Sequence, residues 1–371
     1  MVAAPGEMTQ FVTGSIKVLR RDARACMPRQ GEKMSAETEI FGRLPSGEPV
    51  HRVTLRGGGL TAKVITWGSV IQDLRLEGHA PPLVLGFEDF DSYPAHSAYF
   101  GATPGRNANR IGGGRFTLDG KAYQLELNEN GVTHLHGGSD NIGKRNWTTV
   151  ARTEDSVTLR ITDPDGRAGY PGNCTVTCTY RLKPGGVLNV VYESETDAPT
   201  LANVCQHSYF NLDGGEDARG HDIMIAADHY LPTDERLIPT GEIRPVAGTA
   251  FDLREMTSLR RQMEGEKIAY DHNFCLSPER AQKRSVALAR SINSGVSLEV
   301  LTTEPGVQLY TGGKLKVPVP GLGGRRYGPF AGFCLETQVW PDAVNHDGFP
   351  TAVLRPGETL RQETDYVFAK N

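Results

Sequence analysis

The feature that most constrains the fold of this chain is the repeated occurrence of short strand-like runs, each followed by a glycine- or proline-rich turn. Such runs include "HRVTLRGGGLTAKVITWGSVIQDLRL", "SVTLRITDPDGRAGYPGNCTVTCTYRLKPGGVLNVVYES" and "RSVALARSINSGVSLEVLTTEPGVQLYTGG". Asp-Gly, Asn-Gly and Pro-Gly pairs are typical of hairpins and tight connections. The 371 residues include 43 glycines and 23 prolines, so turns are frequent. The pattern predicts an all-β fold, a large antiparallel β-sandwich.

Helices are expected to be few and short, with "FEDFDSYPAHS" (87–97) and "LREMTSLRRQME" (253–264) as the best candidates. No repeat or linker divides residues 37–371, which predicts a single domain. Residues 1–36 are polar and basic and lack periodicity. We therefore expect a disordered N-terminal extension, within which Met34 is a candidate for the true start of the protein.

Charge and motifs exclude several classes of function. The net charge is −4 and both signs are mixed along the chain, so neither nucleic-acid binding nor membrane binding is expected. No signal peptide or membrane-spanning stretch is evident, and the six cysteines form no C-x-x-C pair. These observations predict a cytoplasmic protein with reduced thiols. "IGGGRF" and "PGLGGRR" do not join a buried parallel strand to a helix, so no nucleotide or flavin cofactor is expected.

One carboxylate stands out in "AGFCLETQVWPDAVN" (331–345). Strand alternation places Phe333, Leu335, Thr337 and Val339 on one face, and Glu336 on the other with Cys334, Gln338 and Trp340. A carboxylate in such company is partly dehydrated, which is costly unless the group is paired or used. From position alone a structural role is the favoured interpretation, because most perturbed carboxylates are not catalytic.

Other polar segments offer partners. In "NVCQHSYFNLDGG", His207 lies in a polar row and is equally compatible with a structural and an acid–base role. "GRNANRI" presents Asn109 and Arg110 from a loop, where sugar-hydroxyl binding and a surface ion pair are both open.

Three further residues are candidates with a plainer alternative each. Asp252 in "GTAFDLR" suits an N-cap as well as a binding role, and Gln308 in "PGVQLYTGG" faces away from Val307 and Leu309. "THLHGG" places His134 and His136 on one strand face. A metal site with Asp140 as third ligand is the weaker interpretation, because two histidines on one face are common without metal.

Taken together, these segments resemble a known family. "GRNANRI", "HLHGG", "DPDGRAGYPGN", "HSYFNLDG", "PTGEIRPVAGTAFDLR", "YDHNFCL", "TTEPGVQLYTG" and "GFCLETQVWPDAVN" resemble the motifs of the aldose 1-epimerase (galactose mutarotase) family in order and spacing. The resemblance runs from about residue 40 to the C-terminus. It implies a β-sandwich of the galactose-mutarotase type with a sugar cleft, no cofactor and no metal. It also implies a free hexose such as D-galactose or D-glucose as substrate.

The resemblance also implies roles for individual residues. Glu336 would be the general base, His207 the general acid and His136 an assisting histidine, while His134 keeps a structural role. Asn109, Arg110, Asp252 and Gln308 would hold the sugar hydroxyls. The acid–base roles require Glu336 to be ionised and His207 to be protonated, and they predict a bell-shaped pH profile with Glu336 on the acid limb. Trp340 is a candidate for stacking on the sugar.

Alternatives remain open from the sequence. A glycosidase needs two carboxylates, for which Asp252 and Glu336 are candidates, but His207 argues against it. A hexose-6-phosphate 1-epimerase needs a phosphate site, for which Arg325 and Arg326 in the loop 313–328 are candidates, although loop charges are usually solvated. A non-catalytic sugar-binding module needs no matched acid and base. The preferred aldose, the pathway and the choice between monomer and homodimer are not readable from the sequence.

Overall fold

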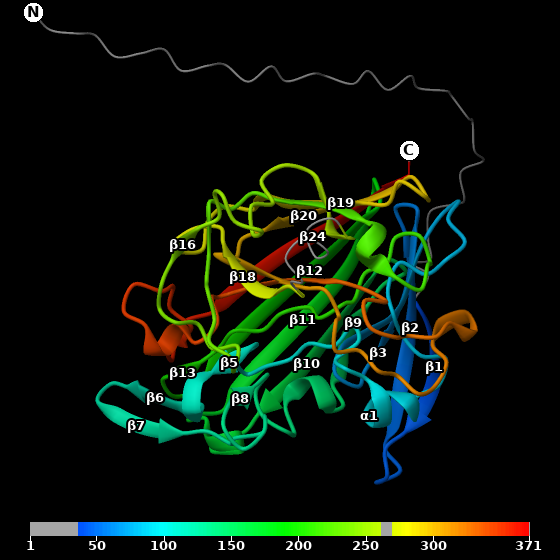
Figure 1. Cartoon of the computed structure of the whole chain (residues 1–371). Coiled ribbons are helices and arrows are strands. Elements are labelled where there is room, and N and C mark those ends of the chain that lie inside the picture. Colours follow the sequence, from blue (N-terminus) through cyan, green and yellow to red (C-terminus); the bar gives the residue numbers. More distant parts are fainter. Residues whose placement is uncertain (1–35, 261–268, 371) are drawn as a thin grey trace, which may run out of the picture. The chain divides into compact units, whose positions relative to one another are not determined.

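A computed structural model describes residues 36–260 and 269–370 (Figure 1). The predicted N-terminal extension lies outside these residues except for Ala36, as does the candidate start at Met34. Met34–Asn371 is one compact unit. The prediction of a single domain over 37–371 stays a prediction.

The largest sheet has nine antiparallel strands within the described part of the chain. Its order is β17 (Thr257–Ser258), β14 (Asp222–Ile225), β19 (Arg284–Arg290), β20 (Val296–Thr302), β24 (Leu360–Lys370), β12 (Val187–Thr196), β11 (Cys174–Lys183), β10 (Ser156–Asp163) and β9 (Thr148–Arg152). The long strands β10, β11, β12 and β24 run side by side (Figure 1). Along β11 buried residues alternate with half-buried ones and the exposed Arg181, as expected for a strand with one face on the core.

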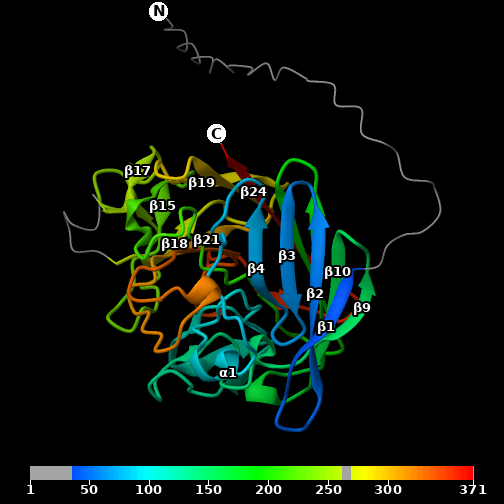
Figure 2. The same ribbon diagram turned by 90° about the vertical axis from the view of Figure 1, so that its right-hand side faces the viewer.

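A second sheet packs against this one. It orders as β1 (Glu37–Arg43), β2 (Pro49–Gly57), β3 (Leu60–Ile65) and β4 (Val70–Leu76), all antiparallel (Figure 2). Leu55 of β2 and Val64 of β3 belong to the same apolar cluster as Val176 and Tyr180 of β11. The two sheets therefore bury their apolar faces against each other, and the predicted all-β antiparallel sandwich is confirmed.

A five-stranded antiparallel sheet carries the polar residues of interest. Its order is β16 (Arg244–Pro245), β15 (His229–Tyr230), β18 (Asp271–Cys275), β21 (Gly306–Tyr310) and β22 (Cys334–Gln338). Phe274, Val307 and Leu335 point from this sheet into the main core. The alternate residues of β18, β21 and β22 face the other way, where they border a pocket.

The remaining elements are short. Two-stranded pairs join β13 (Thr200–Leu201) to β23 (Val353–Leu354), β5 (Arg110–Ile111) to β8 (His134–Leu135), and β6 (Arg115–Leu118) to β7 (Lys121–Gln124). The α-helix α1 (Ser92–His96) lies inside the predicted segment 87–97. The second predicted segment, 253–264, is only partly described: Thr257–Ser258 is strand β17 instead of helix, whereas Leu259 and Arg260, the last residues described before the gap, are helical. The 3-10 turns are Gly112–Gly114, Ile142–Lys144, Arg167–Gly169, Ala218–Gly220, Leu322–Gly324 and Ala343–Asn345.

No helix in the described ranges has both the length and the apolar character that crossing a membrane requires. The five described cysteines, Cys174, Cys178, Cys205, Cys275 and Cys334, are free thiols.

Candidate active site

A pocket of about 240 Å³ opens beside the polar face of the five-stranded sheet. Segments far apart in the sequence converge on it, which follows from the long crossovers between the strands of this sheet. Its lining residues are Ala98, Tyr99, Asn109, Arg110, Glu129, Leu135, His136, His207, Tyr209, Asp271, Tyr310, Lys314 and Glu336. A larger hollow lies along the β6–β7 hairpin, but it is lined by no carboxylate and no histidine.

Glu336 lies in the middle of β22 and is 2% exposed. Its cross-strand neighbour is Gln308 of β21. Burial and then the negative charge of Asp271 raise the pKa of Glu336 to about 8, although Cys205 and Arg110 act in the opposite direction. Glu336 Oε1 is 3.6 Å from His207 Nε2, so the two groups are close enough to share a proton through a small adjustment or a bound hydroxyl.

His207 is held on three sides. Its backbone N–H donates to Ala102 O at 2.9 Å. Its imidazole is stacked between the rings of Tyr99 and Tyr209, with centroids 5.7 and 5.2 Å away. Its Nδ1 is 3.6 Å from Cys334 Sγ, which leaves Nε2 to face Glu336. Burial among these groups lowers the pKa of His207 to about 4.

These pKa values mean that the Glu336–His207 pair holds one proton between about pH 4 and pH 8. At neutral pH that proton lies on Glu336 and His207 is neutral. The sequence predicts the opposite distribution, with an ionised glutamate and a protonated histidine. The reason for the difference is that burial disfavours both charges, and the pair reduces that cost by keeping both groups neutral.

His136 lies directly after β8, with φ 54°. Its Nδ1 accepts a hydrogen bond of 3.1 Å from the backbone N–H of Asn109. A backbone amide is always a donor, so the proton of a neutral His136 must be on Nε2. Burial, together with the nearby His207 and Arg110, lowers the pKa of His136 well below its ordinary value. His136 is therefore a neutral residue that offers an N–H donor.

The donor atoms of His136, His207 and Glu336 lie within 4.8 Å of one another, a spacing that also occurs in metal sites. A metal ligand needs a lone pair, and the hydrogen bond from Asn109 leaves Nε2 of His136 protonated. The donor set therefore suits hydrogen bonding and proton transfer better than metal binding.

A row of polar groups lines the pocket beside this pair. Arg110 donates two hydrogen bonds of 2.8 Å to Glu129, from Nε and Nη2. Its Nη1 is 3.8 Å from Asp271 Oδ2. Gln308 Nε2 donates to Asp271 Oδ1 at 2.8 Å. Fixed donors and acceptors of both kinds thus border the pocket, an arrangement that suits a ligand rich in hydroxyl groups.

Comparisons with known proteins now identify the family. Residues 51–367 match the family model described as aldose 1-epimerase. The chain belongs to the aldose 1-epimerase family.

Individual relatives agree with this assignment. Over 343 residues the chain is 45% identical to a galactose mutarotase of Rattus norvegicus, covering 91% of this chain and 99% of the relative. It is 35% identical to the aldose 1-epimerase of Escherichia coli K12, covering 87% and 96%. The crystal structure of a GalM/aldose epimerase homologue from C. elegans superposes with a TM-score of 0.81 at 29% identity, covering 86% and 99%.

Most of the residues that the family resemblance suggested converge on one pocket. Glu336, His207, His136, Asn109 and Arg110 all line it. Gln308 lies immediately beside it, buried, and contacts Asp271 through its amide.

Asp252 does not line this pocket. The expectation that it lies in the sugar site therefore has to be corrected. It is hydrogen-bonded to Arg254 at 2.8 Å in a separate hollow, which also includes Thr249 and Glu255. The aspartate that lines the pocket, together with Glu129 and Glu336, is Asp271. The sequence contained a signal, because Asp271 is the second residue of the family segment "YDHNFCL" and lies on the same face of β18 as Asn273. Its proximity to Gln308 depends on strand pairing, which the sequence does not reveal.

Further residues of the family pocket were missed by sequence reasoning. Glu129 lies in a turn, and nothing in its local sequence indicates that it will pair with Arg110. Tyr99, Tyr209 and Tyr310 line the pocket from three different segments, and Lys314 borders it from the loop 313–328.

Two other candidates have structural surroundings instead. Trp340 lines a different hollow, donates its indole N–H to Pro305 O at 2.8 Å and packs on Phe349, so the stacking prediction is wrong. Arg325 is half-buried, donates to Gly215 O and lies over the ring of Tyr327. Neither Arg325 nor Arg326 lines the pocket.

His134 has the predicted structural role. Its Nδ1 lies 2.7 Å from Glu126 O and its Nε2 lies 2.7 Å from the hydroxyl of Tyr170. Asp140, the candidate third metal ligand, is paired with Arg167.

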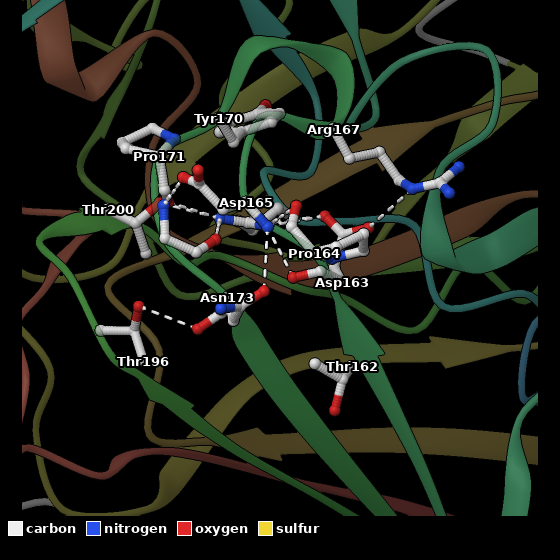
Figure 3. A network of polar contacts seen from close by, with 12 residues as sticks. Thr162, Asp163, Pro164, Asp165, Arg167, Tyr170, Pro171, Asn173, Thr196 and Thr200 are labelled. Carbon is white, nitrogen blue, oxygen red and sulfur yellow. Dashed lines mark hydrogen bonds and ion pairs between the residues drawn. The ribbon is translucent and has the colours of Figure 1, made fainter.

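Tyr170 belongs to the loop between β10 and β11, whose polar contacts are drawn in Figure 3. In that loop Asp165 accepts a hydrogen bond from Gly172 N at 2.6 Å, and Asn173 Oδ1 accepts one from Asp165 N at 3.1 Å. The loop thus presents Tyr170 to the strand that precedes His136.

Proposed function

We propose that this protein is an aldose 1-epimerase that interconverts the α and β anomers of free hexoses such as D-galactose and D-glucose. The observation that carries the proposal is the 3.6 Å approach of Glu336 Oε1 to His207 Nε2 at the wall of a polar pocket. The pair holds one proton near neutral pH. One base and one acid are what ring opening requires, because nothing is oxidised and no group is transferred.

The reaction follows from these two groups. With the proton on His207, ionised Glu336 removes the proton of the C1 hydroxyl while the C1–O5 bond breaks and C1=O1 forms. His207 gives its proton to the departing ring oxygen O5. Rotation about C1–C2 then exposes the other face of the aldehyde. In reclosure, O5 attacks C1, His207 recovers its proton from O5, and Glu336 returns a proton to O1.

The surrounding residues bind and orient the sugar. Asp271 supplies acceptors, while Arg110, Asn109 and the Nε2–H of His136 supply donors. Gln308 acts through its hydrogen bond to Asp271. General acid–base assistance of this kind contributes roughly 10²–10⁴-fold to the rate, and holding the sugar between both groups adds a positioning contribution.

Polarimetry of fresh α-D-galactose and α-D-glucose tests the proposal directly. We expect the wild type to accelerate the relaxation of optical rotation and the Glu336→Gln variant to lose that acceleration. Equal rates for both proteins would refute the assignment of the base. Release of reducing sugar from an aryl glycoside would instead support a glycosidase, and tight sugar binding without turnover would support a binding module.

A hexose-6-phosphate 1-epimerase is the second candidate. One observation favours it, because the Lys314 side chain borders the pocket and its ammonium could meet a phosphate. Arg325 and Arg326 of the same loop do not border the pocket. Parallel assays with the 6-phosphates decide between the two substrates. A cytoplasmic location and a monomeric or homodimeric state stay predictions, which fractionation and light scattering test.

A further inference from the structure

Two buried thiols contact the catalytic pair. Cys205 Sγ lies 3.6 Å from Glu336 Oε2, and Cys334 Sγ lies 3.6 Å from His207 Nδ1. Cys205 comes two residues before His207, and both side chains contact the Glu336 carboxyl group. Cys205 is 1% exposed. The segment therefore delivers a thiol to one end of the Glu336 carboxylate and an imidazole to the other.

The direction of the hydrogen bond follows from the chemistry of the thiol. Burial and the adjacent charge of Glu336 raise the pKa of Cys205 well above its ordinary value, so the sulfur keeps its hydrogen. The thiol S–H is then the donor and Glu336 Oε2 the acceptor. Because Oε2 faces Cys205, Oε1 is turned toward His207 Nε2.

Other ionisable groups also act on Glu336. Asp271 of β18 disfavours its ionised form, while Arg110 of β5 favours it. Arg110 is engaged in two hydrogen bonds with Glu129. Five further ionisable groups lie close to Glu336 or are affected by its charge. They are His207 and Tyr209 from the segment after β13, Tyr310 from β21, Cys334 from β22 and Tyr366 from β24. Cys205 is thus a close hydrogen-bond donor that, like Arg110, favours the ionised form of Glu336 against the effects of burial and Asp271.

We propose that Cys205 is a positioning residue of the epimerase reaction, whose thiol orients Glu336 toward His207 and stabilises its ionised form. The inference rests on the proposed function of Glu336 as the base. A thiol is a weak donor, so it assists ionisation without making the carboxylate a poor base. Cys205 is not among the pocket-lining residues, so it acts on the reaction through its hydrogen bond to Glu336.

The test compares Cys205→Ala, which removes the donor, with Cys205→Ser, which keeps a donor of stronger type. Cys275→Ser is the matched control, because Cys275 is a half-buried thiol of the same sheet that does not contact the pair. Each protein is assayed by polarimetry with α-D-galactose from pH 5 to pH 9.5, with the uncatalysed rate subtracted. Thermal melting confirms that each variant is folded.

Without the donor, Glu336 holds its proton more tightly. We expect the high-pH limb of kcat/KM for Cys205→Ala to move upward by about half a pH unit, with a roughly threefold lower plateau and little change in KM. Cys205→Ser should place the limb at or below its wild-type position, and Cys275→Ser should match the wild type.

Two results separate the possible failures. Suppose that the wild type is active and that Cys205→Ala and Cys205→Ser have the same high-pH limb as each other. This result would overturn the inference, whether or not that limb differs from the wild-type one, because donation of a hydrogen bond would then be irrelevant. If Cys205→Ala does not fold, a Cys205→Ser limb above that of the wild type overturns it. A wild type that fails to accelerate mutarotation at all would refute the proposed function, which is a different result.

Discussion

Asp271 and Asp252 offer a matched comparison of two aspartates, only one of which lines the pocket. We predict that Asp271→Asn greatly weakens catalysis on galactose, whereas Asp252→Asn leaves it nearly unchanged. The asparagine keeps an acceptor oxygen for the hydrogen bond from Gln308 but loses the negative charge. The substitution therefore tests sugar binding by the carboxylate more than the integrity of the fold.

The magnitude follows from the kind of contact that is lost. A hydrogen bond to a charged group contributes about 1.5–3 kcal/mol, which corresponds to a roughly 10–150-fold loss of kcat/KM. We expect most of this loss as an increase in KM. The charge of Asp271 also raises the pKa of Glu336, so its removal should move the high-pH limb of the profile to lower pH. Asp252 is 30% exposed in its side chain and pairs with the exposed Arg254, so its substitution should change kcat/KM by less than about twofold.

Polarimetry across pH 5–9 on both variants, with thermal melting as a check of folding, provides the measurement. The reasoning would be wrong if Asp252→Asn were the more damaging change. It would also be wrong if folded Asp271→Asn kept the wild-type KM and the wild-type pH profile. Asp271 would then neither bind the sugar nor influence the pKa of Glu336.

Further predictions concern the same pocket. Glu336→Gln and His207→Asn should each lower kcat by about 10²–10⁴-fold, and the double variant should be little worse than either, because the two groups act as one unit; additive losses in single-turnover rates would contradict this. The wild-type kcat/KM should follow a bell between limbs near pH 4 and pH 8, and a flat profile from pH 5 to pH 9 would exclude the shared proton. Because Glu129 holds Arg110 by two hydrogen bonds, Glu129→Gln should raise KM about tenfold with a smaller change in kcat, and isothermal titration with galactose should show the same loss of affinity.

The pH profile also illustrates a limit of assignment by residue type. The sequence predicts that Glu336 governs the acid limb, whereas the pKa values associate the lower limb with His207 and the upper limb with Glu336. Both assignments give the same bell, since each describes a pair that holds one proton. Carbon-13 NMR of the Glu336 carboxyl group would distinguish them.

The sequence by itself determined the fold class and the two central catalytic candidates. Turn residues and alternation are local properties, so they indicated antiparallel strands and placed Glu336 on the polar face of β22. His207 was found in the same way, from a polar row and a family motif. The choice of Glu336 and His207 as catalytic candidates came from the family resemblance and needed no knowledge of which strands are neighbours.

The tertiary structure alone decided the composition and electrostatics of the pocket. That Asp271 rather than Asp252 lines it depends on the pairing of β18 with β21, and that Glu129 holds Arg110 depends on a turn folding over β5. The location of the shared proton depends on how thoroughly Tyr99, Tyr209 and the core exclude water. These properties arise from contacts between residues distant in the chain, and local sequence carries little information about such contacts because register and burial are set by the whole fold.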